Sequence, residues 1–216
     1  MACSCRPPAT AGFYSRLFAR AYDPVMERVE RSLLAAMRRE LLSPLTGDVL
    51  EVGAGTGVNL PFYNHSAQVL ACEPSAPMLA VARQKWASME APPQLTFIQA
   101  GVLDAAFTAR CRPNSFDAAV CTLVLCTVPR PAEVLDNLFS WLKPGGQLLV
   151  LEHVQPHHWV KKACFRALQP LWGVLAEGCQ LSRPTRRLIL QAGFRPQWEK
   201  HFDKGIPFLQ AVYAKP

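Results

Sequence analysis

A glycine-rich turn is the segment of this sequence whose residue types and spacing are best suited to binding a ligand. It reads EVGAGTG over residues 51–57 and follows a short apolar run. Glycines let the backbone adopt positive φ and let a ligand approach closely, and free amides at the start of a helix favour a negatively charged group. The spacing is GxGxG, whereas the dinucleotide fingerprint GxGxxG uses a third glycine to pack its helix over a pyrophosphate. The turn therefore predicts a nucleoside ligand without a diphosphate, and a purely structural turn is the alternative.

A single carboxylate follows the second expected strand. Glu73 lies 22 residues beyond Glu51, directly after the run QVLAC and before Pro74. A carboxylate at this strand end can accept hydrogen bonds from both hydroxyls of a ribose, which is why nucleoside-binding sheets place an acid there. An acid that is only solvated in the loop is the alternative. The turn and the acid at this separation together favour a nucleoside site.

Histidine and cysteine side chains suggest two further kinds of chemistry. His153 ends the fifth expected strand, where open α/β sheets bind ligands, so we predict that it acts as a general base. The alternative is a hydrogen-bonding role in a loop or pocket. His157 and His158 are adjacent, and adjacent residues on a helix or strand point apart, so they are not expected to share a metal ion. The eight cysteines contain no CxxC pair, and the sequence predicts no metal site.

Alternating strand and helix patterns must position these residues. Apolar runs bounded by turn residues predict seven strands, at 48–52, 68–72, 95–100, 116–125, 147–154, 195–201 and 207–214. Helical spacing predicts helices over 77–89, 132–142 and 185–192. Before them, Asp23-Pro24 reads as an N-cap followed by proline at the first helical position, opening a helix that Ser43-Pro44 ends. Strands separated by helices imply parallel βαβ units, so the predicted fold class is α/β, a doubly wound, mostly parallel seven-stranded sheet with helices on both faces.

Composition and charge leave several partners open. The formal net charge is +7 and the basic residues are scattered, so charge does not separate a nucleic acid from an anionic membrane or an anionic substrate. The longest apolar run, residues 118–128, is far below the roughly 18 residues needed to span a bilayer, so we expect no transmembrane segment. Residues 13–22 combine helical spacing with arginines and no acid. A docked helix in a cytoplasmic protein with reduced thiols is favoured, and mitochondrial targeting or peripheral membrane association is the alternative.

Four phrases of the sequence, EVGAGTG, ACEPS, NSFDAAV and LKPGGQLLV, together resemble the class I S-adenosylmethionine-dependent methyltransferase superfamily. The resemblance is close over residues 22–154, and it implies a Rossmann-like fold and S-adenosylmethionine as the cofactor. With 216 residues, half of them hydrophobic, the chain is long enough for one sizeable core. We expect an irregular segment, 1–12, and a single methyltransferase domain, 13–216. The parts of this domain are expected to be N-terminal helices (13–47), a cofactor-binding core (48–154), a cover over the acceptor (155–184) and a C-terminal helix with strands (185–216).

The resemblance also implies which residues bind the cofactor. Gly53, Gly55 and Gly57 would surround its methionine end. Glu73 would bind the ribose, and the segment Gly101-Val102 would lie at the adenine. Other residues of the same segments are expected to complete the cofactor site: Tyr22, Glu51, Ala54, Asn59, Pro74, Met78, Cys121, Thr122 and Leu123.

The segment after the fourth strand indicates the class of acceptor. Residues 121–126 read CTLVLC, an apolar wall, instead of the Asn-Pro-Pro-Tyr or Pro-Cys motifs that mark nucleic-acid methyltransferases. No aromatic residues alternate along a basic strip, as single-stranded nucleic acid requires, so we expect a small-molecule acceptor and no nucleic acid. CTLVLCTV, LEHV and GCQLSR look like the mammalian alkyl-thiol S-methyltransferases, without the hydrophobic N-terminal anchor of those proteins. The predicted substrate-binding residues are Cys126, Trp159 and Trp172.

These features predict methyl transfer to a small, largely apolar acceptor, with a thiol favoured. Transfer from a sulfonium is an in-line displacement without a covalent enzyme intermediate, so Cys121 and Cys126 are expected to be core or pocket wall rather than nucleophiles. His153 would help to deprotonate the thiol. YDPVM at residues 22–26 is similar to the start of bacterial lipid and quinone methyltransferases, so such acceptors are the alternative. The intact glycines and acid disfavour a catalytically silent binding module, and the glycine spacing disfavours a nicotinamide-dependent oxidoreductase.

Overall fold

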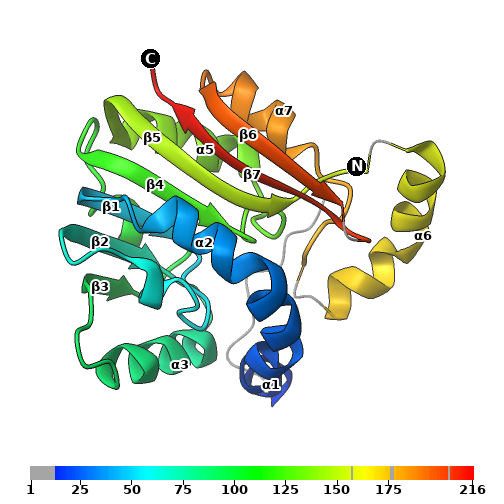
Figure 1. Ribbon diagram of the computed structural model, residues 1–216, viewed down its shortest axis with the longest axis horizontal. Coiled ribbons are helices and arrows are strands. Elements are labelled where there is room, and N and C mark those ends of the chain that lie inside the picture. The colour runs from blue at the N-terminus through cyan, green and yellow to red at the C-terminus, as the bar shows by residue number, and fades with distance from the viewer. Residues whose placement is uncertain (1–12, 157, 176–177, 204) are drawn as a thin grey trace. The chain divides into compact units, whose positions relative to one another are not determined.

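The structure is a computed structural model that describes residues 13–156, 158–175, 178–203 and 205–216 (Figure 1). It divides into two compact units, one ending at Arg112 and the other beginning at Pro113. The first unit carries the glycine-rich turn and Glu73, and the second carries His153.

Three parallel strands form the centre of the first unit. Its elements are α1 (Phe13–Val29), the π-helical segment η1 (Glu30–Leu34), α2 (Ala35–Leu42), β1 (Gly47–Val52), the 3-10 helix η2 (Leu60–Phe62), β2 (Ala67–Cys72), α3 (Ala76–Ala87), β3 (Gln94–Ile98) and α4 (Ala105–Thr108). β1 pairs with β2 and β2 pairs with β3, both in parallel, and the predicted strands are confirmed to within two residues. The glycine-rich turn follows β1 and Glu73 follows β2, so parallel pairing brings them to the same end of these strands.

The N-terminal helix differs from the prediction. α1 continues through Pro24, so the prediction that a helix begins at Asp23-Pro24 is wrong. Proline removes a backbone donor from a helix interior, and the π-helical segment η1 follows directly after α1. The Asp23 carboxylate is engaged elsewhere, because it accepts a hydrogen bond from Thr56 Oγ1 (2.6 Å) and forms an ion pair with Lys85 Nζ (2.5 Å). These tertiary contacts prevail over the local capping signal.

Four strands form the sheet of the second unit. Its elements are β4 (Phe116–Thr122), α5 (Pro131–Trp141), β5 (Leu142–His153), α6 (Trp159–Leu175), α7 (Thr185–Gln191), β6 (Arg195–Asp203) and β7 (Pro207–Ala214). β4 pairs with β5 in parallel, and β7 pairs with β5 and with β6 in antiparallel orientation. The strand predicted to continue to Leu125 ends at Thr122, because Leu123 adopts a φ of +56°, in the left-handed region. β5 starts at Leu142, five residues before the predicted start at 147, and so includes residues 143–146, which were not predicted to be part of a strand.

The seven strands follow the order β3-β2-β1-β4-β5-β7-β6 in a mostly parallel sheet. Helices separate most of the consecutive strands, as βαβ connections require. The predicted α/β fold class and the seven-stranded, mostly parallel sheet are therefore confirmed. Within the second unit, α6 lies beyond the ends of β6 and β7 instead of covering a face of the strands (Figure 1).

Candidate functional site

The glycine-rich turn of the first unit is open on one side and closely packed on the other. Gly53, Gly55 and Gly57 have φ angles of +70°, +56° and +78°. A Cβ atom added at Gly57 would lie 2.7 Å from Leu60 Cδ1 and 3.1 Å from the Cα atom of Ala82, so this glycine lets η2 and α3 pack against the turn. A Cβ atom at Gly55 would meet nothing within 4 Å. The turn thus presents its backbone to open space at Gly55.

This asymmetry predicts different effects of two alanine substitutions. Each should cost roughly 1–2 kcal/mol of stability, because a side chain disfavours the left-handed conformation. Gly57→Ala should cost about 1–3 kcal/mol more, because its methyl group overpacks the contact with Leu60 and Ala82. Urea unfolding of Gly55→Ala and Gly57→Ala measures the difference, with Gly55→Ala serving as the matched control. Equal losses of stability would contradict the packing role of Gly57.

Glu73 lies directly beside this open position. Its Oε2 atom accepts the N–H of Gly55 (2.9 Å), its Oε1 atom accepts the N–H of Ser75 (2.8 Å), and the residue is buried. The N–H groups of Gly53 and Ala54 donate to the carbonyl of Cys72 (2.9 and 3.0 Å), which fixes the turn to the end of β2. A carboxylate has two oxygens with about four acceptor positions, which suits the two hydroxyls of a diol. The negative charge suits a diol and disfavours a phosphate at this position.

Glu51 and Asn59 belong to a buried polar network. Asn59 Nδ2 donates to Glu51 Oε1 (2.6 Å), and Asn59 Oδ1 accepts from Arg38 Nη1 (2.6 Å). Arg38 also pairs with Glu30 through its Nε atom (2.8 Å). Burial raises the pKa of Glu51, against the opposing effects of its hydrogen-bond partners and Arg38. Arg38 and Glu30 were missed by the sequence analysis, because no motif marks a buried arginine on an otherwise amphipathic helix.

The remaining predicted cofactor residues of the first unit lie around these segments. Met78 is buried on α3, Pro74 is exposed after β2, and Tyr22 is half-buried with its ring 5.6 Å from that of Phe18. Asp23, next to Tyr22, ties α1 to the turn through Thr56.

The segment after β3 contains an acid that the sequence analysis overlooked. Val102 is buried, and the N–H of Gly101 donates to Asp104 Oδ2 (2.6 Å). Asp104 lies three residues after Gly101 in the sequence, and no motif marked it. The exposed Asp104 is therefore turned back toward the segment expected at the adenine.

Two cysteines and a histidine meet in the second unit. His153 is the last residue of β5, and its Nε2 atom lies 2.7 Å from Cys179 Sγ. The ligand atoms of Cys126, His153 and Cys179 all lie within 4.8 Å of one another, and all three residues are buried. Trp172 Nε1 donates to Cys179 Sγ (3.3 Å). The structure thus brings together the predicted residues Cys126, His153 and Trp172, and adds Cys179, which was quoted in the motif GCQLSR but given no role.

Contacts within the cluster shift the pKa of Cys179 in one direction and the pKa values of His153 and Cys126 in the other. Hydrogen bonds from Cys126 and His153, together with the charge of His153, lower the pKa of the Cys179 thiol well below its usual range. Burial alone would lower the pKa of His153, but its contact with Cys179 and the nearby charge of Glu152 raise it. The hydrogen bond to Cys179 and burial raise the pKa of Cys126. These shifts favour the thiolate form of Cys179 beside His153 and the thiol form of Cys126.

Buried charges hold the loop that carries Cys126. Glu152 Oε1 accepts the N–H groups of Val124 and Leu125, both at 2.7 Å. Arg183 Nη1 donates to the carbonyls of Leu125 (2.5 Å) and Val128 (2.6 Å). Burial raises the pKa of Glu152 to about 7, against lowering effects from His153 and the two backbone N–H groups. Neither charged residue was predicted to have this role, because Glu152 lies within an apolar strand and Arg183 is one of many scattered basic residues.

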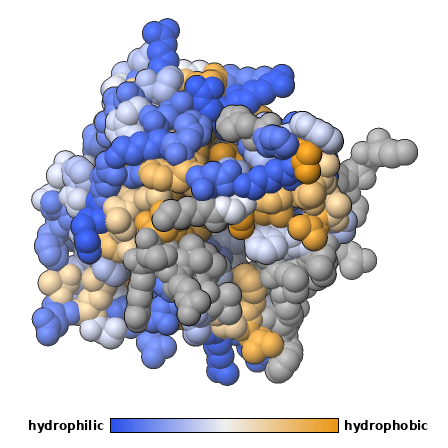
Figure 2. Space-filling view, turned by 45° about the vertical axis from the view of Figure 1, so that its right-hand side comes forward, coloured by the Kyte–Doolittle hydropathy of each residue, from blue (hydrophilic) through white to orange (hydrophobic). Residues whose placement is uncertain are grey.

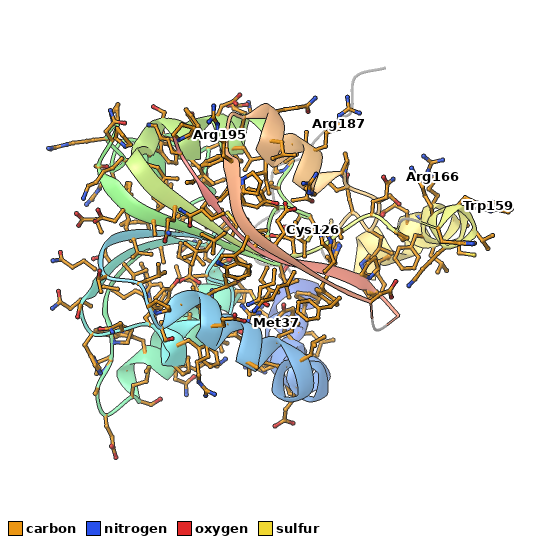
Figure 3. All side chains as sticks on the ribbon, turned by 45° about the horizontal axis from the view of Figure 1, so that its top comes forward. Met37, Cys126, Trp159, Arg166, Arg187 and Arg195 are labelled. Atoms are coloured by element: carbon orange, nitrogen blue, oxygen red, sulfur yellow. The ribbon has the colours of Figure 1, made fainter. Side chains whose placement is uncertain are left out.

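Cys121, Thr122 and Leu123 lie at the end of β4. Cys121 and Thr122 are buried, and the N–H of Leu123 donates to the carbonyl of Leu151 (2.8 Å). Trp159 lies elsewhere, on α6 and away from Cys126 in Figure 3, with 76% of its surface exposed. The structure therefore does not bring Trp159 to the cluster that Trp172 joins.

The surface of α6 combines apolar and basic side chains. Figure 2, with the side that bears α6 turned forward, shows hydrophobic residues beside hydrophilic ones. The large apolar side chains that α6 exposes are Trp159, Val160, Leu168 and Trp172. In the part of the chain that the structure describes, no helix has both the length and the apolar character needed to cross a bilayer.

Comparisons with known proteins match most of the chain. Residues 50–150 match a family model described as a methyltransferase domain. Thiol S-methyltransferase TMT1B of Mus musculus is 34% identical over 209 residues, which are 94% of this chain and 83% of that protein. Phosphatidylethanolamine N-methyltransferase of Cereibacter sphaeroides is 33% identical over 107 residues, 50% of this chain and 51% of that protein. A solved structure of the complex between a Haloferax volcanii methyltransferase and its activator Trm112 gives a TM-score of 0.69 at 15% identity, covering 99% of this chain and 100% of that chain, and so supports the fold alone.

Proposed function

Because this chain belongs to the class I S-adenosylmethionine-dependent methyltransferase superfamily, we propose that it transfers the methyl group of that cofactor to the sulfur of a small, largely apolar thiol. The observation that carries the choice of acceptor is the similarity to a thiol S-methyltransferase over 94% of this chain. The lipid N-methyltransferase matches only half of the chain. A match over 94% of the chain necessarily extends beyond residues 48–154, into segments proposed to contact the acceptor.

The first unit supplies the proposed cofactor residues, and its geometry fits the cofactor. Gly55 leaves open space where any other residue would place a Cβ atom, and the adjacent carboxylate of Glu73 suits the two ribose hydroxyls. When bound, S-adenosylmethionine supplies a methyl group on a sulfonium, which is a good leaving group. Gly53, Ala54 and Gly57 are proposed to shape the turn around the methionine end. Other proposed contacts come from the neighbouring segments: Tyr22, Glu51, Asn59, Pro74, Met78, Gly101 and Val102.

The second unit supplies the proposed acceptor residues. A thiol reacts as its thiolate, so the acceptor must lose a proton before or during methyl transfer. We propose that His153 promotes this loss together with Cys179, whose Sγ atom contacts its Nε2 atom. Buried apolar residues at the end of β4 and the indole of Trp172 are proposed to exclude water from the acceptor, which favours an in-line displacement.

A methyl-transfer assay on the full chain tests the acceptor class. With radiolabelled cofactor, we expect label in the product of an alkyl thiol and little or none in a quinone or an aminophospholipid presented under the same conditions. Calorimetry with S-adenosylhomocysteine separates activity from binding. Binding of S-adenosylhomocysteine without methylation of any acceptor would contradict the proposed enzyme activity and favour a silent binding module. Labelled quinone or lipid without labelled thiol would contradict the choice of sulfur as the acceptor atom.

A lipid amine is the second candidate acceptor, because one feature of α6 favours it. Trp159, Val160 and Leu168 are exposed on α6. The exposed basic residue Arg166 lies on the same helix as Trp159 (Figure 3). Exposed tryptophan and basic residues on one amphipathic helix suit the headgroup region of an anionic membrane. We infer a small-molecule acceptor in a cytoplasmic protein, with peripheral membrane contact through α6 if the acceptor is a lipid.

A further inference from the structure

Three side chains of the kind that bind transition metals converge outside the proposed cofactor residues. Cys126 lies in the loop after β4, His153 ends β5, and Cys179 follows α6. Their ligand atoms all lie within 4.8 Å of one another, and the residues are 2%, 7% and 6% exposed. Cys126 and Cys179 are 53 residues apart in the sequence, so no short spacing motif marks the set. The fold itself assembles two sulfur donors and one nitrogen donor.

We propose that Cys126, His153 and Cys179 bind one zinc ion and leave its fourth coordination position for the acceptor thiol. Zinc binds cysteine sulfur and histidine nitrogen in tetrahedral geometry, and three protein ligands with an open position are typical of catalytic zinc sites. Soft sulfur ligands combined with imidazole favour zinc over magnesium, calcium or manganese. The choice of a thiol as the fourth ligand rests on the proposed thiol methyltransferase function. The assignment of the three protein ligands is independent of that function.

The distances require only a small adjustment. With Zn–S and Zn–N bonds of about 2.3 and 2.1 Å, two ligand atoms of a tetrahedral ion lie roughly 3.5–3.8 Å apart. His153 Nε2 and Cys179 Sγ are 2.7 Å apart, a hydrogen-bond distance, and therefore must separate by about 1 Å to admit the ion. The other ring nitrogen of His153, Nδ1, has no hydrogen-bond partner among the described residues, so no second hydrogen bond fixes the ring against this movement.

Proton release balances the charges. Metal ligands must be deprotonated, so zinc binding displaces the proton shared by His153 and Cys179 and the thiol proton of Cys126 to solvent. The resulting zinc centre, Zn²⁺ with two thiolates and one neutral imidazole, has a formal net charge of zero. An acceptor thiol that enters the fourth position loses its own proton to solvent and binds as a thiolate, because a coordinated thiol is deprotonated outright. His153 then promotes thiol ionisation as a metal ligand instead of as the final acceptor of the proton.

The residues around the cluster hold it in place. Trp172 Nε1 donates to Cys179 Sγ, and Gln169 Nε2 donates to the carbonyl of Cys179 (2.8 Å). The N–H of Gln180 donates to the carbonyl of Cys126 (3.0 Å), which ties the two cysteine segments together. Supporting hydrogen bonds of this kind orient metal ligands and raise their affinity. They also distinguish the cluster from cysteines that merely fill a core.

Cobalt binding tests the protein ligands. The full chain, reduced and freed of metal by a chelator, should bind one equivalent of Co²⁺ with sulfur-to-cobalt charge-transfer absorption and the intense visible bands of tetrahedral Co²⁺, and Zn²⁺ should abolish both. Cys126→Ser, His153→Ala and Cys179→Ser should each lose this spectrum. The matched control is Cys111→Ser, because Cys111 is a buried cysteine outside the cluster and should leave the spectrum unchanged. Circular dichroism verifies that each variant is folded.

A thiol titration tests the open position and separates this proposal from the methyltransferase function. Adding 2-mercaptoethanol to the Co²⁺-loaded chain, without S-adenosylmethionine, should increase the charge-transfer absorption. An unchanged spectrum would overturn the open position. Absence of tetrahedral Co²⁺ binding by the folded, reduced chain would overturn the zinc site even if thiols are methylated. If the ion binds but no thiol is methylated, the proposed function fails and the metal site remains. A Cys126–Cys179 disulfide that persists under reductant, detected by mass after alkylation, would also overturn the site.

Discussion

Replacing Glu73 with alanine is expected to weaken the binding of S-adenosylhomocysteine about 5- to 150-fold. This range corresponds to roughly 1–3 kcal/mol, the cost of leaving polar ligand groups unpaired in a buried site. Glu73 is buried, and its carboxylate lies against the open backbone position at Gly55. Isothermal titration calorimetry of the wild-type chain and Glu73→Ala measures the change.

Two further variants separate ribose binding from support of the turn. Glu73 also accepts the N–H groups of Gly55 and Ser75, so its removal affects local structure as well as the ligand. Glu73→Gln keeps one side-chain acceptor and should show a smaller loss of affinity. Glu90→Gln changes an exposed acid in the loop after α3 and should bind like the wild type. Wild-type affinity in Glu73→Ala would refute the assignment of this carboxylate to the ribose.

Replacing Glu152 with alanine is expected to lower the free energy of unfolding by about 2–6 kcal/mol. The substitution leaves the buried N–H groups of Val124 and Leu125 without their acceptor, at roughly 1–3 kcal/mol for each. That loss is a large part of the roughly 5–15 kcal/mol that stabilises a typical domain. Glu152→Gln keeps a carbonyl oxygen and should lose much less. Urea unfolding compares the variants, with Glu133→Ala as the control, since Glu133 forms an exposed ion pair with Arg130.

The pH dependence of stability gives an independent test of Glu152. Burial raises its pKa from the ordinary value of 4.5 to about 7, so the folded chain binds this proton more tightly than the unfolded chain does. Its contribution to stability is therefore fully present below about pH 4.5 and is lost as pH rises through about 7. Relative to Glu152→Gln, the wild type should lose about 3 kcal/mol between these pH values. Parallel stability profiles for the two proteins would show that Glu152 titrates normally.

Local patterns in the sequence were sufficient for the parallel strands and for the association of the turn with Glu73. Each strand of the first unit is an apolar run bounded by turn residues, and parallel pairing brings its carboxyl end to that of its neighbour. The predicted end of β4 was wrong, because the apolar run from Cys121 to Leu125 contains no sign that Leu123 adopts a left-handed backbone conformation. Hydrophobic pattern reports burial and carries no information on φ.

Contacts between segments that are distant in the sequence were the main features that could not be predicted. Asp23-Pro24 has the residues of a helix start, but Thr56 and Lys85 engage the carboxylate, and both are far along the chain. The pairing of His153 with Cys179 depends on how the chain returns after α6, which no spacing rule describes. The sequence therefore indicated the local elements more reliably than the contacts between distant segments.

The left-handed backbone at Leu123 restricts how this position can vary among natural homologues. It turns the chain sharply after β4, where the next two amides reach Glu152. Valine, isoleucine and threonine tolerate this conformation poorly, whereas asparagine, aspartate and glycine adopt it readily. Evolutionary drift at residue 123 should accordingly favour small polar replacements and exclude β-branched ones, although β4 itself contains Val120 and Thr122.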